Sequence, residues 1–402
     1  MILANLRGRS DLQLGSGGPR IDCRGLTLLP GFVDLHCHLR EPGLEHKETI
    51  RTGTAAAAAG GFTTLCCMPN TEPAIDTLAT LRLVQDTART EGAVRVLPIA
   101  AATRGRAGSE LTDMAELAGA GAVAFSDDGN PVADSRLMRL ALEYAASFGR
   151  PVIDHCEDPR LTAGAAMHEG AVSERLGLPG WPTAGEEVMV ARDIALAAQT
   201  GAHVHLAHLS TAPAVELVRA AKRRGIRVTA EVTPHHLTLT DAWVERGGYD
   251  TNCKVNPPLR TDADRAALLE GLIDGTIDAI ATDHAPHARV DKECEFETAA
   301  FGISNLETAF GSLMGLVHAG QLPFELLVEK LTRGPADVLG LSLPEDDWIV
   351  VDPDAEWTVD VDRFRSRGHN SPLHGQRLTG RVLLTVCRGM VAFDALSEAV
   401  AA

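Results

Sequence analysis

The chain has 402 residues, with 37 Lys or Arg and 54 Asp or Glu, and its formal net charge is −17. This charge, without any run of basic residues, argues against a nucleic-acid-binding protein because phosphates would be repelled. The apolar fraction of 45% and the charged fraction of 23% are typical of a folded globular chain and argue against intrinsic disorder.

The cysteine pattern and the hydrophobic runs bear on location. The eight cysteines are scattered and form no C-x-x-C pair, so we expect no disulfide scaffold. The first ten residues contain arginines and no long apolar stretch, which predicts no signal peptide. No run of about 18 apolar residues occurs, so no membrane-spanning helix is expected. We therefore expect a cytoplasmic protein.

Short apolar or β-branched runs alternate with longer Ala- and Leu-rich segments between about residues 30 and 285. Five clear helical patterns follow at 76–90, 134–148, 185–199, 212–224 and 262–274. A regular β/α alternation with eight strands predicts an α/β fold, a (β/α)8 TIM barrel, whose active site lies at the carboxyl ends of the strands. The eight predicted strands are 31–38, 63–68, 94–100, 122–126, 151–155, 203–208, 227–232 and 279–282.

The two ends of the chain differ from this pattern. Short β-like runs separated by Gly, Pro and Asp occur at 12–14, 26–29, 348–351, 357–361 and 381–386. We expect them to pair into one small β module built from both termini. The predicted division is therefore a module of residues 1–30 and 340–402 and a barrel of residues 31–339.

Residues that can bind a metal fall at the ends of the predicted strands. In the sequence His36-Cys37-His38, alternation along a strand points both imidazoles to one face and the thiol to the other. A lone His-x-His pair or a lone Asp after a strand is common without any metal, so the prediction depends on the combination. Nitrogen and oxygen donors together suit a borderline divalent cation such as zinc. The candidate donors are His36, His38, Asp127, Asp128, His155, His208 and Asp283.

This set exceeds the three protein ligands of a single catalytic zinc, which predicts two ions that share a bridging group. The chain has only five lysines, and none of them ends a predicted strand. The bridge should therefore be a carboxylate, and both Asp127 and Asp128 are candidates.

Several motifs resemble those of the dihydroorotases of the amidohydrolase superfamily, over about residues 25 to 390. They include DLHCHLREPG at 34–43, MPNT at 68–71, DDG at 127–129, DHCE at 154–157 and ATDHAPH at 281–287. AHLST at 207–211, EVTPHH at 231–236, NPPLR at 256–260 and the Phe301-Gly302 pair add to the resemblance. The likeness is to the longer bacterial type, in which an aspartate replaces a carbamylated lysine. The short N-terminal arm departs from that pattern and leaves less sequence for the β module.

The resemblance implies a role for each of these residues. His36, His38 and Asp283 would bind one zinc ion, His155 and His208 the other, and Asp128 would bridge them. Arg40, Asn70 and His287 align with residues that hold the substrate carboxylates. Asn256 and the Phe301-Gly302 backbone align with those that contact the pyrimidine ring, and His38 belongs to the substrate site as well. His205 and His235 are expected to be structural, and His284 to support a ligand.

The implied reaction is the reversible conversion of N-carbamoyl-L-aspartate and L-dihydroorotate in de novo pyrimidine (UMP) biosynthesis. A metal-bound hydroxide would be the nucleophile, and Asp283 would act as general base and then general acid. Arg40 would hold a substrate carboxylate through a two-pronged hydrogen bond.

Two other interpretations compete with this one. The first is another cyclic amidase, a hydantoinase or allantoinase, against which Arg40 and the missing strand-4 lysine argue. The second is an inactive scaffold for aspartate carbamoyltransferase, against which the complete set of expected ligands argues. An association of an active enzyme with that transferase stays open. We also expect a homo-oligomer.

Overall fold

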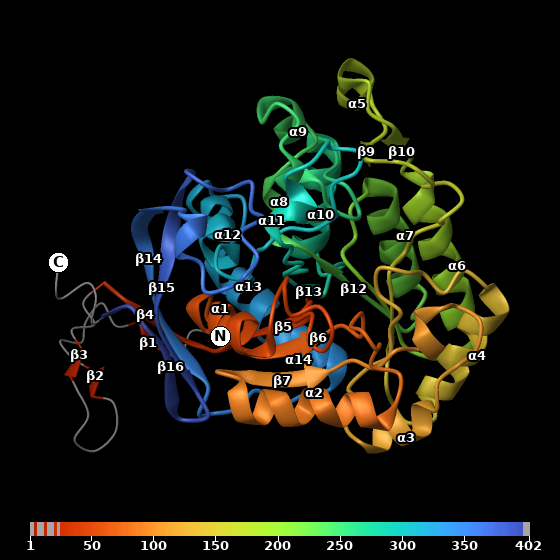
Figure 1. Cartoon of the computed structure of the whole chain (residues 1–402), viewed down its shortest axis with the longest axis horizontal. Coiled ribbons are helices and arrows are strands. Elements are labelled where there is room, and N and C mark those ends of the chain that lie inside the picture. The colour runs from red at the N-terminus through yellow and green to blue at the C-terminus, as the bar shows by residue number, and fades with distance from the viewer. Residues whose placement is uncertain (1–3, 6–11, 14–19, 22–24, 397–402) are drawn as a thin grey trace.

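The computed structural model describes residues 4–5, 12–13, 20–21 and 25–396. Seven parallel strands form the inner layer of the fold, and helices surround them (Figure 1). Each predicted strand except the fourth is confirmed, with ends that differ by at most two residues. The strands are β5 (Phe32–Cys37), β6 (Phe62–Cys67), β7 (Arg95–Pro98), β8 (Val152–Asp154), β11 (Val204–Leu206), β12 (Val228–Val232) and β13 (Ala279–Ile280).

The predicted fourth strand, 122–126, is not a regular strand, although it occupies the fourth position. Phe125 forms single parallel bridges to Ala100 and to Val152, and so joins the β5-β6-β7 sheet to the β8-β11-β12-β13 sheet. A parallel bridge between Cys37 and His284 closes the ring on the other side. The fold is therefore a TIM barrel, as predicted.

The five predicted helices are also confirmed, as α2 (Leu78–Glu91), α4 (Ser135–Ala146), α6 (Ala184–Thr200), α7 (Ala212–Arg223) and α10 (Asp262–Ile273). Side-chain caps fix where several of them begin. For example, the Thr261 side chain accepts from the Asp264 backbone at the start of α10, and Asp264 bonds back. Further helices are α1 (Ile50–Ala59), α3 (Met114–Gly119), α12 (Ala309–His318), α13 (Phe324–Leu331) and α14 (Arg333–Leu339).

Shorter elements lie in the connections between strands and helices. Helices α5 and α9 project at one end of the molecule in Figure 1. Among the residues that the structure describes, no helix combines the length and the apolar character that a membrane crossing requires. The shorter elements are β9 (Met167–His168), α5 (Ala171–Leu176), β10 (Gly180–Trp181), α8 (Pro234–Thr238), α9 (Ala242–Arg246) and α11 (Arg289–Lys292).

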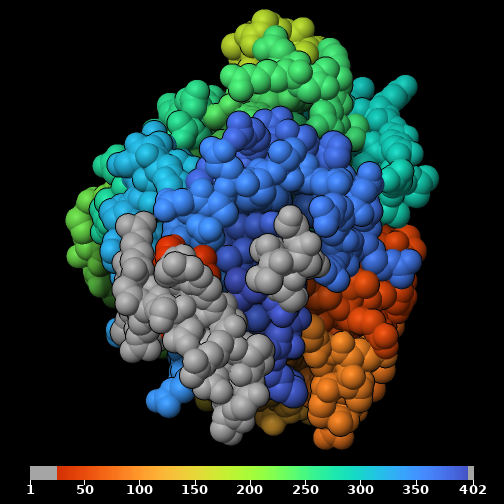
Figure 2. Space-filling view, turned by 90° about the vertical axis from the view of Figure 1, so that its left-hand side faces the viewer, coloured from red at the N-terminus to blue at the C-terminus, as the bar shows by residue number. Residues whose placement is uncertain are grey.

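A five-stranded antiparallel sheet contains strands from both ends of the chain, which confirms the expected β module. Its order is β1 (Ala4–Asn5), β4 (Thr27–Pro30), β14 (Trp348–Thr358), β15 (Arg377–Cys387) and β16 (Met390–Asp394). Figure 2 faces this side of the molecule and shows the C-terminal residues in blue running down its middle, with barrel segments on both sides.

Three details of the module differ from the expectation. Residues 348–351 and 357–361 were expected as two strands, but β14 continues from the first into the start of the second and ends at Thr358, with register shifts after Val350 and Asp352. Residues 12–14 were expected in the module, but β2 (Leu12–Gln13) pairs with β3 (Arg20–Ile21) in a separate sheet, and Leu14 lies outside the described residues. Strand β16 was not predicted. The domain division at residues 30/31 and 339/340 stays a prediction.

One large apolar core connects the barrel to this sheet. Phe32 and Phe62 of the barrel belong to the same buried cluster as Ile349 and Val382 of the terminal sheet. The Thr385 side chain also donates a hydrogen bond to the backbone of Ala58 at the end of α1. The sheet is therefore packed on the barrel, and its long β14–β15 connection can reach residues near the strand ends.

Candidate metal centre

The His-x-His sequence at the end of β5 has the predicted geometry. His36 and His38 are both buried, and their ring centroids lie 5.4 Å apart. Cys37 points the other way, with its sulfur 3.5 Å from the Cys66 carbonyl oxygen. Alternation along the strand therefore directs two imidazoles toward one point and leaves the thiol in the apolar core.

Asp128 and Asp283 approach these two imidazoles. Nε2 of His36 is 3.2 Å from Oδ1 of Asp128 and 3.5 Å from Oδ1 of Asp283. Nε2 of His38 is 3.0 Å from the same Asp283 oxygen. Asp283 has a φ of 44°, a left-handed backbone conformation that turns its side chain as the chain leaves β13.

His155 and His208 complete the cluster. Nδ1 of His155 lies 2.9 Å from Nε2 of His208, and each of these nitrogens is 3.8 Å from Oδ1 of Asp128. All six predicted metal ligands are therefore close to one another, with Asp128 between the two groups of histidines. Asp127, the other candidate, points away, because its carboxylate accepts hydrogen bonds from the backbone and side chain of Thr103.

The cluster fits a divalent cation. Within the described part of the chain, His36 Nε2 and Asp128 Oδ1 are buried atoms without a hydrogen-bond partner. Burial alone would raise the pKa of Asp128, but the nearby charge of His36 holds it well below its usual value. The donor atoms of His36, His38 and Asp283 lie within 4.8 Å of one another, as do those of His36, Asp128 and His208. Unpaired nitrogen and carboxylate donors that converge in this way are the ligand chemistry of zinc and similar ions.

A further group of polar side chains fixes the orientation of the imidazoles. Oε1 of Glu231 on β12 is 2.8 Å from Nδ1 of His36, and Oε2 of Glu157 is 2.8 Å from Nε2 of His155. Oδ1 of Asn70 is 2.8 Å from Nδ1 of His38. These three imidazoles are thus held from the side opposite to the cluster, as is common for metal-binding histidines.

The residues expected to bind substrate lie beside the cluster. Nε of Arg40 donates to the Pro286 carbonyl at 3.3 Å, and Nε2 of His287 is 2.9 Å from the Phe301 carbonyl. Burial lowers the pKa of Arg40 to about 10, which leaves its guanidinium charged at neutral pH. Nδ2 of Asn256 donates to Glu157 at 3.0 Å.

Two of these residues retain free polar atoms. Among the described residues, His287 Nδ1 and Asn256 Oδ1 are buried and have no hydrogen-bond partner. Burial, with Arg40 nearby, lowers the pKa of His287 to about 2, so this imidazole is neutral. A cavity of about 200 Å³ lies next to His287 and is also lined by Asn252, Lys292 and Asn370.

Comparison with known proteins agrees with the geometry. The family model described as Dihydro-orotase-like matches residues 25–214. A protein named Dihydroorotase from Anaeromyxobacter dehalogenans (strain 2CP-C) is 53% identical over 93% of this chain and 88% of its own length. The chain belongs to the dihydroorotase family.

Other comparisons extend this finding. A Dihydroorotase from Thermoanaerobacter sp. (strain X514) is 50% identical over 94% of this chain and 89% of its own length. Among solved structures, L-hydantoinase (dihydropyrimidinase) from Arthrobacter aurescens has a TM-score of 0.81 and 26% identity, and covers 92% of this chain and 85% of its own. The family consists of hydrolases that act on cyclic amides, and the barrel carries that chemistry here.

Three residues around the cluster were not assigned a role from the sequence. Glu231 belongs to the EVTPHH motif, but its contact with His36 joins two residues that are 195 positions apart in the sequence. Arg106 donates to the backbone oxygens of Asp127 and Asp128 and so holds the turn after the fourth position. Asn370 accepts from the backbone of His287 at 2.9 Å. No local pattern around Arg106 or Asn370 distinguishes either residue from an ordinary loop residue.

The histidines expected to be structural or supporting lie outside the cluster itself. His205 contacts Glu231 with its Nε2 at 3.1 Å, so it supports the same carboxylate as His36. His235 Nδ1 lies 3.2 Å from the Asn305 amide nitrogen. His284 accepts from the Asn305 backbone at 3.0 Å, and its own carbonyl accepts from the His38 backbone at 2.9 Å.

Proposed function

We propose that this chain is a zinc-dependent dihydroorotase that interconverts N-carbamoyl-L-aspartate and L-dihydroorotate in pyrimidine biosynthesis. The convergence of six buried donors carries the proposal, with Asp128 between His36 on one side and His155 and His208 on the other. Two zinc ions per chain are proposed, bound by His36, His38 and Asp283 and by His155 and His208, with Asp128 shared.

The metal would polarise the reacting carbonyl and lower the pKa of water in the site. Asp283 accepts a proton at Oδ1 and returns it to the ring nitrogen that leaves, because this oxygen faces the cluster and lies 3.0 Å from His38. Its pKa lies far below its usual value, since the charges of His36 and His38 outweigh the effect of burial. The carboxylate is therefore ionised and able to accept the proton.

The remaining residues position the substrate. Arg40 binds a substrate carboxylate through paired charge-assisted hydrogen bonds. The neutral His287 is proposed to help hold that carboxylate; its Nδ1 makes no hydrogen bond to the described residues and lies 3.5 Å from Asp291 Oδ2. Asn256 offers its free Oδ1 to a ring N–H. The Gly302 N–H already donates to the Lys254 carbonyl at 2.9 Å, so the Phe301-Gly302 pair would contact the ring through its remaining backbone groups. Asn70, expected on a substrate carboxylate, has its Oδ1 on His38 and its Nδ2 3.5 Å from Asp128, so only its amide hydrogens remain for substrate.

A hydantoinase is the main alternative, because the solved structure from Arthrobacter aurescens has a similar fold. The identity of 26% to that structure is half the 53% to the protein named Dihydroorotase. Arg40, which lies beside the cluster, supplies the cation that a substrate carboxylate needs. The scaffold alternative lacks support, because all six expected ligands are present and near one another.

The test combines metal content with a substrate panel on one preparation. Zinc per chain is measured by elemental analysis, and turnover is measured with dihydroorotate, carbamoyl aspartate, hydantoin and allantoin. Activity confined to the first two compounds, at close to two zinc ions per chain, is the expected result. Activity on hydantoin alone, or none at full metal loading, would contradict the proposal. Activity with only one zinc ion per chain would support the proposed reaction but would contradict the role of Asp128 as a bridge between two ions.

The proposal extends to the setting of the enzyme. We infer a cytoplasmic homo-oligomer, with association with aspartate carbamoyltransferase as an open possibility to test. Light scattering of the purified chain gives its oligomeric state, and the same measurement after mixing with the transferase tests for a complex.

A further inference from the structure

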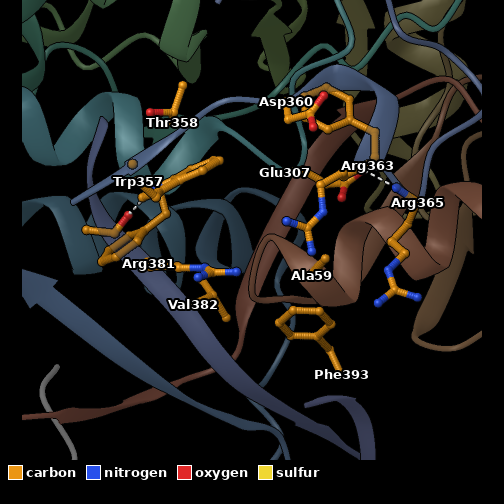
Figure 3. Close-up of a pocket in the computed structure, with 14 residues that line it drawn as sticks. Ala59, Glu307, Trp357, Thr358, Asp360, Arg363, Arg365, Arg381, Val382 and Phe393 are labelled. Carbon is orange, nitrogen blue, oxygen red and sulfur yellow. Dashed lines mark hydrogen bonds between the residues drawn. The ribbon is translucent and has the colours of Figure 1, made fainter. Parts of the chain in front are cut away.

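A second cavity, of about 620 Å³, lies away from the metal centre, between the terminal sheet and the barrel (Figure 3). It is formed by α1 and α12 of the barrel on one side, and by β14, β15, β16 and the β14–β15 connection on the other. Its volume is in the range of small-molecule sites, roughly 300 to 1,000 Å³. Neither the proposed reaction nor its substrate residues use this space.

The polar lining of this cavity is mainly cationic. Arg363, Arg365 and Arg381 line it, and within the described part of the chain their guanidinium groups make no hydrogen bond or ion pair. In Figure 3, the Arg363 and Arg381 side chains reach toward the middle of the cavity, whereas the Arg365 side chain points away. Guanidinium groups that line one cavity without a protein partner favour an anion with several oxygens.

The carboxylates of the lining do not cancel this charge. Glu307 accepts backbone hydrogen bonds from Arg365 at 2.8 Å and from Ser366 at 3.1 Å. Burial raises the pKa of Glu307 to about 8, so this carboxyl is mostly protonated at neutral pH. Asp360 accepts from the Asp362 backbone at 3.1 Å and contributes one carboxylate, against the two guanidinium groups of Arg363 and Arg381. The field inside the cavity is therefore positive.

The apolar lining is aromatic. Phe310, Trp357, Phe364 and Phe393 contribute rings, and the Trp357 indole N–H is fixed by a 3.0 Å hydrogen bond to the Gly380 carbonyl. Aromatic walls of this kind stack on planar rings. A bare phosphate would use the arginines but would leave the rings and most of the volume without contact.

We propose that this cavity binds a nucleoside phosphate, with the base between the aromatic side chains and the phosphate on Arg363 and Arg381. The ligand class follows from the combination of flat apolar walls, two cationic side chains and sufficient volume. Binding at this place needs no metal and does not depend on the proposed reaction.

The experiment is calorimetric titration of the full chain with AMP and with UMP, next to adenosine, uridine and inorganic phosphate. At least one nucleotide should bind with one site per chain, and more tightly than its nucleoside or phosphate. Replacing both Arg363 and Arg381 by Gln should weaken the affinity for that nucleotide roughly tenfold or more, because two charge-assisted hydrogen bonds are lost. Both arginines are exposed and unpaired, so the variant should keep its fold, which circular dichroism checks.

A matched double variant controls for net charge. Arg333 and Arg377 are also exposed, but they pair with Asp337 and Glu356 and do not line the cavity. Their replacement by Gln should leave the affinity unchanged. Absence of binding by both nucleotides, equal affinity for inorganic phosphate, or equal losses in the two double variants would overturn the proposal. Loss of binding in Arg40→Met would place the nucleotide at the metal centre and would overturn it as well.

Discussion

Glu231 is the residue whose substitution tests the metal centre most sharply. Its carboxylate is fully buried between two imidazoles, 2.8 Å from Nδ1 of His36 and 3.1 Å from Nε2 of His205. Burial alone would raise its pKa, but the hydrogen bonds from His205 and His36 lower the pKa to about 2, so Glu231 is ionised. A negative charge there fixes the proton of His36 on Nδ1 and leaves Nε2 free for a metal ion.

Glu231→Gln removes this charge with little change of shape. The amide oxygen can still accept from His36 Nδ1, and the amide nitrogen can donate to His205 once that ring carries its proton on Nδ1. Thr229 Oγ1 lies 2.8 Å from Nδ1 of His205 and can accept that proton. Because partners of metal-bound histidines contribute roughly 10- to 100-fold to affinity, we expect zinc binding to weaken by about 1.4 to 2.7 kcal/mol.

The assay is competition between the metal-free protein and a chromophoric chelator for zinc, with thermal unfolding of the metal-free form measured in parallel. Asp264→Asn is the matched control, because Asp264 is also a buried carboxylate but bonds to Thr261 and the Ala212 backbone on the outer helices. The control should lower the unfolding temperature without changing zinc affinity. If Glu231→Gln loses no more zinc affinity than the control, Glu231 does not orient His36 and the argument is wrong.

Three further substitutions test the proposed roles. Asp283→Ala should lower turnover by orders of magnitude, while the fold is kept and the other ligands still bind zinc. Turnover near that of the unsubstituted protein would exclude an acid–base role. Arg40→Met should raise KM for dihydroorotate strongly with a smaller effect on kcat, and an unchanged KM would remove Arg40 from the substrate site. Asn370→Ala should reduce the free energy of unfolding by roughly 2 to 4 kcal/mol and raise KM, because it leaves the His287 N–H and the Gly302 carbonyl without their hydrogen-bond partner. Denaturant titration measures the change in stability, and steady-state kinetics measure KM.

The barrel and the six clustered donors could be predicted because both follow from local patterns. Alternation along β5 directs His36 and His38 to one face without reference to any other strand. The β/α order then places the ends of all strands at one rim, so a donor that ends a strand faces the others. The fourth position shows the limit of this reasoning, since Phe125 contributes single bridges there and no regular strand. The donor Asp128 still lies at the rim, because backbone bonds hold the segment in place.

Contacts between distant segments could not be predicted. Glu231 reads in the sequence as one residue of an apolar strand, and only the packing of β12 near β5 shows that it holds His36. Residues 352–356 contain Pro353 and three acidic residues, which suggested a break, but β14 continues through them with an irregular register. The choice between Asp127 and Asp128 likewise depends on Thr103, which captures the Asp127 carboxylate from another loop.

The terminal sheet contributes to the site through one connection. Between β14 and β15, the Ser366 hydroxyl donates to Glu48, whose carboxylate lies 3.4 Å from Nε2 of His284, the residue after Asp283. Four residues later, Asn370 bonds to the backbone of His287 and Gly302. Since Glu48 and Asn370 hold the segment from Asp283 to His287 from two sides, the β14–β15 connection fixes the proposed acid–base group relative to the substrate residues. The connection between these two strands therefore positions the residues proposed for catalysis, and a chain reduced to its barrel should lose this positioning even where every proposed metal ligand remained.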